Sequence, residues 1–184
     1  MRAETEAYNQ RVLHPQKSGS LVGIGGSVVT EYNTPTSSNS WGIFSYKTGT
    51  KTTYTHKQYG NPGAPVSAFA RVVSNNLLAS YTGIAFNYQG WSLKFTKSLA
   101  DIGVSISYSI GNTMQSLGIS IGQDCTISVT TTTSTDIGNN ITESSYQTFS
   151  IDLKPFIFFL GAPEAQPSGE GSWQPNLSPA PAYP

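Results

Sequence analysis

The sequence predicts an all-β protein, an antiparallel β-sandwich or small barrel of about nine or ten strands. Between residues 20 and 161, apolar residues alternate with small polar ones, and turn signals follow one another at roughly 8–15-residue spacing. Only 11% of the residues are charged, and 18 are Gly, so Ser and Thr take the place of charge. That composition suits strands whose solvent face is hydroxylated.

The most regular alternation lies in the middle of the chain. Val104, Ile106, Tyr108 and Ile110 alternate with Ser105, Ser107 and Ser109, and a second alternating run covers 117–122. Such alternation indicates strands with one buried face. Trp41 and Trp91 lie in alternating segments, so we expect them to be core residues.

We expect residues 33–40 to form a loop, followed by a hairpin of strands 41–48 and 51–58. A type II′ turn with Gly49 in its first position places Thr48 opposite Lys51 and gathers Trp41, Ile43, Tyr54 and His56 on one face. The alternative three-residue loop sets Lys47 against Lys51, which is unfavourable.

The chain divides into an N-terminal arm (1–19), a β-domain (20–161) and a Pro-rich C-terminal tail (162–184). The apolar run 156–160 ends the β-domain, and we expect it to be buried by the core or by another subunit. The tail cannot bury Trp173 or Tyr183 by itself. We therefore expect Trp173, Tyr183, Trp41 and Tyr54 to be the residues that contact a partner.

Charge and hydropathy exclude several classes of protein. The formal net charge is zero, with no basic patch, which disfavours sequence-specific nucleic-acid binding. No apolar stretch reaches 18 residues, so we expect no transmembrane segment. The N-terminus lacks the apolar region of a signal peptide, which predicts a protein made in the cytoplasm, a component of a particle, or a fragment of a larger exported protein.

No motif carries recognisable chemistry. His14 and His56 have no partner at metal-ligand spacing, and the single Cys125 reads as a small core residue. The run 23–26 is followed by a strand and not by a helix, so its glycines indicate a tightly packed strand and no phosphate loop. We therefore predict no catalytic residue, no metal and no cofactor.

Three functions follow, in order of preference. The first is a structural, self-assembling protein, such as a shell, tail or fibre subunit, whose arms bind neighbouring subunits. The second is a membrane-active toxin domain that uses the Ser/Thr-rich hairpin 126–151. In composition only, that hairpin resembles the Ser/Thr-rich hairpins of aerolysin-like pore formers, and the Gly/Ser/Thr-rich chain resembles the β-domains at the ends of bacterial polymorphic toxins. The third is a carbohydrate- or receptor-binding module that uses exposed Trp and Tyr, which three or more aromatic residues on one concave or flat solvent face would support.

Overall fold

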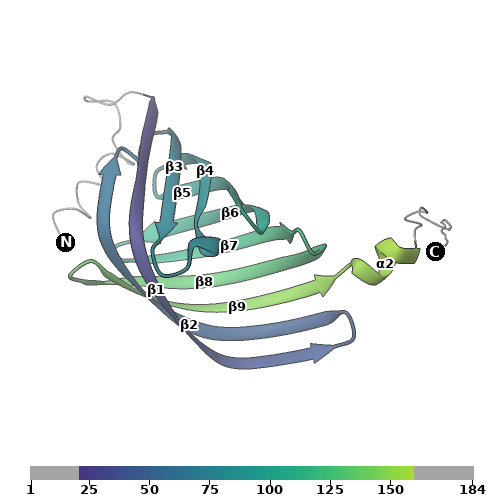
Figure 1. Ribbon diagram of the computed structural model, residues 1–184. Helices are drawn as coiled ribbons and strands as arrows, with labels where there is room; N and C mark the ends of the chain where they lie inside the picture. Colours follow the sequence, from purple (N-terminus) through teal and green to yellow (C-terminus); the bar gives the residue numbers. More distant parts are fainter. Residues whose placement is uncertain (1–20, 160–184) are drawn as a thin grey trace. The chain divides into compact units, whose positions relative to one another are not determined.

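The computed structural model describes residues 21–159. It contains nine strands, a 3₁₀ turn η1 (Leu77–Ala79) and a short helix α2 (Lys154–Phe159) (Figure 1). The strands are β1 (Val22–Trp41), β2 (Phe44–Gly60), β3 (Val66–Val73), β4 (Tyr81–Tyr88), β5 (Trp91–Ser98), β6 (Asp101–Ile110), β7 (Thr113–Gly122), β8 (Thr126–Gly138) and β9 (Ile141–Asp152). The predicted fold class is confirmed.

The strands form one closed barrel in the order β1-β2-β9-β8-β7-β6-β5-β4-β3. Strands β3 to β9 follow each other around the wall as an antiparallel meander, because short turns join them. A parallel pairing of β1 with β3, from Val22↔Val66 to Val29↔Val73, closes the barrel. Of the two architectures that the sequence allowed, the chain adopts the barrel.

The hairpin predicted around Gly49 is wrong. The turn lies at Gly42 and Ile43, where Trp41 pairs with Phe44, and β1 and β2 run on as one long hairpin (Figure 1). Gly42 has a φ of +58°, the left-handed conformation that glycine adopts without strain. The expected loop 33–40 is part of β1, because the partner strand β2 satisfies its backbone despite the turn-forming composition.

Glycine lets the backbone pack closely where β1 closes the barrel. A Cβ on Gly23 would lie 2.4 Å from the backbone oxygen of Asn61, and one on Gly60 would lie 1.9 Å from that of Ile24. Gly60 also has a φ of +77°. The prediction that the glycines of 23–26 mark a tightly packed strand is confirmed.

The inner face of the barrel is the small, hydroxylated face. Ser67, Ala85, Ser92 and Ser107 are all buried, and each occupies an inward position of its strand. The neighbours of Ala85, Ser92 and Ser107 in the sequence point outward and are large and apolar, for example Ile84, Leu93 and Ile106. The alternation therefore has a buried face, as predicted, but it is the serine face.

The segment after the barrel begins at Asp152. The Asp152 carboxylate accepts a hydrogen bond of 2.9 Å from the backbone amide of Lys154, at the start of α2. Phe156 and Ile157 are exposed in the single chain, so burial by the core is not seen for these two residues, and burial by another subunit stays a prediction. In the part of the chain that the structure describes, no helix has the length and apolar character needed to cross a membrane. The N-terminal arm and the tail lie outside the described residues.

Candidate functional site

The predicted contact residues fall into two groups. Trp41 and Tyr54 lie on β1 and β2 and are exposed, which agrees with a contact role. Trp173 and Tyr183 lie outside the described residues. The expected core role of Trp41 and Trp91 is wrong, because half or more of each side chain is open to solvent, at 56% and 50%. Alternation shows that two faces differ, but it does not show which one points inward.

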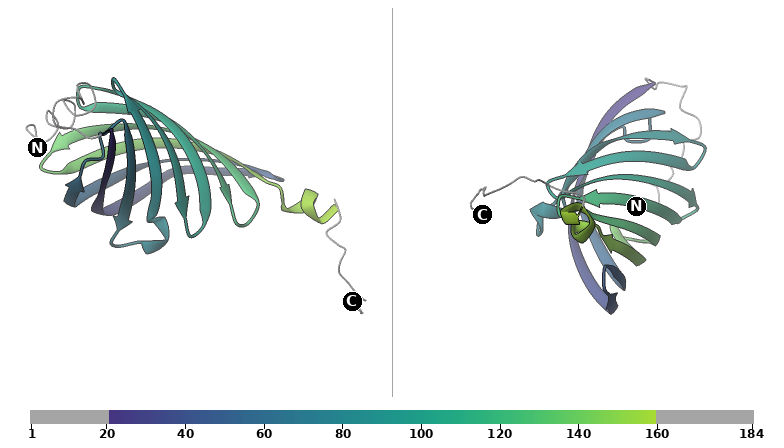
Figure 2. Two further views of the ribbon diagram at one scale, coloured as in Figure 1. Left: turned by 90° about the horizontal axis from the view of Figure 1, so that it is seen from above. Right: turned by 90° about the vertical axis from the view of Figure 1, so that its right-hand side faces the viewer.

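Strands β4 to β7 carry an outward face made of large apolar side chains, which we call the apolar sector. Register places these residues beside one another on neighbouring strands: Ile84 pairs with Phe95, Phe86 with Leu93, and Ile106 with Leu117. All are exposed, although they are large. The apolar sector consists of Ile84, Phe86, Leu93, Phe95, Ile102, Ile106, Leu117, Ile119 and Ile121. Figure 2 shows the four strands side by side in one curved sheet.

Aromatic residues border the apolar sector where β4 and β5 meet. Tyr88 pairs with Trp91, and Trp91 pairs with Tyr108 of β6. The Trp91 and Tyr108 rings lie 4.6 Å apart between centroids, tilted by 45°. These three side chains share the outward face of the barrel, and a binding role for them stays a prediction.

The outward face of β2, β8 and β9 is hydroxylated instead, and we call it the polar sector. Its members are Thr48, Thr50, Thr131, Thr133, Ser145 and Gln147, and they line most of a shallow hollow of about 280 Å³. Thr36, Gly49 and Tyr146 complete the lining. The hydroxyl groups of the polar sector thus occupy the middle of β2, β8 and β9, whereas the outward faces of the same strands carry apolar residues such as Phe44, Val129 and Phe149 nearer their ends.

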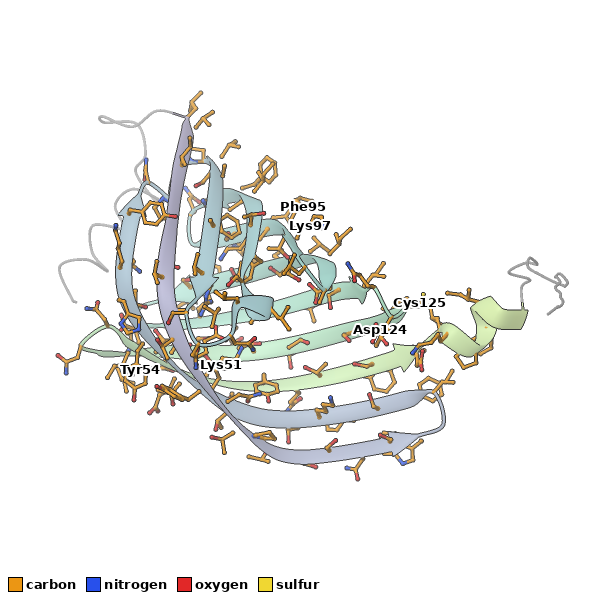
Figure 3. The ribbon with its side chains drawn as sticks, viewed as in Figure 1. Lys51, Tyr54, Phe95, Lys97, Asp124 and Cys125 are labelled. Carbon is orange, nitrogen blue, oxygen red and sulfur yellow. The ribbon has the colours of Figure 1, made fainter. Side chains whose placement is uncertain are left out.

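Charged residues gather inside the barrel, on the wall formed by β1, β2, β3 and β5. Glu31 bonds Arg71 at 2.6 Å and lies 3.6 Å from the Lys51 ammonium. Lys51 and Tyr54, both labelled in Figure 3, are three residues apart on β2 and therefore lie on opposite faces, with Lys51 inside the barrel. We call Glu31, Lys51, Arg71 and Lys94 the ionic cluster.

Lys94 joins the ionic cluster through aromatic rings. Its ammonium lies 5.5 Å from the centre of the Phe69 ring, two strands away, and that ring meets Tyr81 edge-on at 5.9 Å. Tyr81 is the register partner of Arg71. Desolvation of the Tyr81 phenol raises its pKa, but the positive charges of Arg71 and Lys94 outweigh that effect and lower the pKa below its ordinary value. The inner wall is therefore electropositive at this point.

Sequence reasoning missed both the ionic cluster and the apolar sector. The charged residues are isolated in the sequence, and only the parallel pairing of β1 with β3 brings Glu31 to Arg71. The alternation of Ile and Ser in the sequence predicted a face of apolar residues, but it did not predict that this face points outward.

The histidine that the structure describes lies on the outside of the barrel. His56 sits in a bulge of β2, and its Nε2 lies 2.5 Å from the Thr30 hydroxyl, which is 2.9 Å from that of Ser74. No carboxylate is part of this group of hydrogen bonds. Within residues 21–159, no three His, Cys, Asp or Glu side chains come together in a metal-binding group.

No protein-family model, no curated protein and no solved structure matches the chain.

Proposed function

We propose that this protein binds lipid membranes through the apolar sector, with the barrel lying side-on and the polar sector in water. The observation that supports the proposal is the reversal of the usual barrel pattern: the inner face is hydroxylated and the outer face is apolar. A protein surrounded by water rarely exposes a contiguous apolar patch of more than a few hundred Å². Nine large side chains on four adjacent strands form such a patch.

The polar sector argues for side-on binding. A barrel that spans a bilayer needs an apolar band on every strand. Here the middle of the outward face of β8 and β9 holds Thr131, Thr133, Ser145 and Gln147, and apolar residues such as Val129 and Phe149 lie only nearer the strand ends. These groups keep their hydrogen bonds only in water or against another polar surface. One half of the barrel therefore suits lipid and the other half suits water, so the proposal places no strand across the membrane.

The energy available from the apolar sector is large enough for binding. Burying a whole Leu, Ile or Phe side chain contributes about 1.5–3 kcal/mol. The nine side chains are roughly half exposed, so each contributes about 1 kcal/mol on entering the acyl region. Trp91, Tyr88 and Tyr108 fit the interface between lipid and water, because each ring has an apolar body and a polar tip.

Fluorescence of a variant that keeps Trp91 as its only tryptophan tests this function directly. We expect zwitterionic phosphatidylcholine vesicles to shift its emission to shorter wavelength and to carry the protein down on centrifugation. Soluble oligosaccharides should leave the emission unchanged. If the vesicles have no effect and an oligosaccharide shifts the emission, the three aromatic residues form a glycan site and the membrane proposal fails.

Self-assembly is a second candidate function, and an open strand edge favours it. β1 pairs with β3 only as far as Val29, and Asn75 then bonds both backbone groups of Glu31, at 3.1 and 2.6 Å. Beyond that point, among residues 21–159, no strand pairs with the second edge of β1. Open edges add strands from other molecules. Pro35 lies in this edge and has no N–H to donate, so it limits such pairing.

Light scattering on the full chain and on a chain ending at residue 161 tests the self-assembly candidate. The strands of the barrel end at Asp152, so we expect the shortened chain to keep its β-sheet circular dichroism. If the tail binds neighbouring subunits, the shortened chain associates less than the full chain. Equal association of the two would exclude the tail as an assembly arm and leave the edge of β1 as the contact.

A further inference from the structure

We propose that the ionic cluster inside the barrel is a binding site for an oxyanion, such as a phosphate group, held by Arg71 and Lys94. The inference is independent of membrane binding, because it concerns the inner wall and not the apolar sector. Its basis is an imbalance of charge. Lys51, Arg71 and Lys94 carry three positive charges against the one negative charge of Glu31, an excess of two.

Uncompensated charge inside a protein is costly, because the surroundings are less polar than water and the charges repel one another. Glu31 is shared between two cations, and the Tyr81 phenol helps it to stabilise the Arg71 charge, so the charge that has no carboxylate partner among the described residues is that of Lys94. Two further inward carboxylates, on β6 and β8, lie near strand ends and bond locally: Asp101 accepts from the Ser98 hydroxyl at 2.9 Å, and Asp136 from the Gly138 amide at 3.0 Å. A bound anion would supply the missing negative charge.

Arg71 has donor capacity left for such an anion. Its Nη2 bonds Glu31 and its guanidinium also bonds the Tyr81 side chain, but its Nε is buried and has no hydrogen-bond partner among residues 21–159. A guanidinium presents several N–H groups in one plane, which suits the oxygens of phosphate. Lys94 interacts with the Phe69 ring, so no carboxylate neutralises its ammonium within the described residues. Buried donors without protein partners are rare, and this N–H is free to bind an oxyanion.

Solvent can reach the ionic cluster, so an ion can enter. The side chains of Arg71 and Lys51 keep 27% and 37% of their surface exposed, although both point into the barrel. The lowered pKa of Tyr81 reports the same electropositive region. The facing wall is lined mostly by serine, threonine and glycine, which add hydroxyl donors, with Met114 and Tyr146 as its larger side chains.

Thermal unfolding of the full chain in inorganic phosphate tests the site, with chloride at matched ionic strength as the reference. A ligand that binds only the folded state raises the melting temperature as its concentration rises. We expect a rise of several degrees in phosphate. Lys94→Gln should weaken the apparent affinity about tenfold or more, because it removes a charge-assisted hydrogen bond. Lys94→Arg keeps the charge and should keep the effect.

Lys97→Gln is the matched control, since Lys97 is on the same strand, three residues away, and points outward (Figure 3). It removes the same charge from the protein and should leave the phosphate effect unchanged. Phosphatidylglycerol vesicles in chloride distinguish a lipid phosphate from the free ion: stabilisation by vesicles that Lys94→Gln abolishes assigns the site to a lipid headgroup. The proposal fails if phosphate acts no more than chloride, or if Lys97→Gln weakens its effect as much as Lys94→Gln.

Discussion

Replacing Ile106 with Arg separates lipid binding from folding. Ile106 lies in the middle of β6 with 43% of its surface exposed, between Leu93 and Leu117 of the neighbouring strands. In water an exposed substitution of this kind changes the free energy of unfolding by no more than about 0.5 kcal/mol. We therefore expect Ile106→Arg to fold normally.

On a membrane the same change should be costly. Losing the lipid contact of the exposed part of the isoleucine costs about 1 kcal/mol. Placing a guanidinium among acyl chains costs about 1–2 kcal/mol more at a depth between the interface and the middle of the bilayer. Together these terms weaken partitioning into phosphatidylcholine vesicles roughly 30- to 160-fold, since 1.36 kcal/mol is a factor of ten.

The matched control is Ser145→Arg, because Ser145 occupies an exposed outward position on β9 and pairs with Thr50 of β2, so both residues lie in the polar sector. It introduces the same charge into the polar sector and should leave partitioning almost unchanged. Vesicle co-sedimentation and urea unfolding of both variants give the two quantities. Equal loss of partitioning in both variants would refute side-on binding, and loss of folding by Ile106→Arg in water would show that another part of the protein covers the apolar sector.

Two further predictions concern stability, and both are measured by urea unfolding. Glu31→Gln should lower the free energy of unfolding by roughly 1–3 kcal/mol, because it leaves Arg71 without its carboxylate partner. The control Glu143→Gln, on the outer face, should change the free energy of unfolding by less than about 0.5 kcal/mol, and equal effects of the two variants would mean that the Glu31 ion pairs contribute nothing. Gly60→Ala should lower the free energy of unfolding more than Gly111→Ala, because both glycines have a positive φ but only a Cβ at residue 60 would meet backbone atoms. Equal losses of stability would show that the backbone around residue 60 relaxes freely.

The number and type of the strands were predictable, because both depend on local pattern. Period-two alternation and turn residues gave an all-β chain of nine or ten strands, and the barrel has nine. The turn of the first hairpin was not predictable from its residues. Gly49-Thr50 and Gly42-Ile43 are both acceptable turns, and the choice between them depends on which pairings β2 makes with β9 and β1 together.

The direction of the alternation was not predictable for a different reason. A strand with isoleucine on one face and serine on the other fits a water-soluble barrel with isoleucine inside or an inverted barrel with isoleucine outside. Sequence reasoning chose the first for Trp41 and Trp91, because most barrels in water bury their apolar face. The ionic cluster was hidden likewise, because its members come from four strands and become neighbours only when β1 closes on β3.

The inverted pattern also accounts for the small inner residues. A core of serine, glycine and threonine contributes little hydrophobic stabilisation, since each side chain buries little apolar area. The barrel must then depend on its backbone ladders and on inward hydrogen bonds, such as Ser128–Ser150 at 2.8 Å and Thr130–Thr148 at 2.9 Å. Each hydrogen bond of this kind makes a net contribution of only about 1 kcal/mol to the free energy of unfolding. Covering the apolar sector with lipid, and neutralising Arg71 and Lys94 with an anion, would each add stabilisation that the interior lacks. Vesicles and phosphate act on opposite faces of the wall, so their effects on the unfolding midpoint should add.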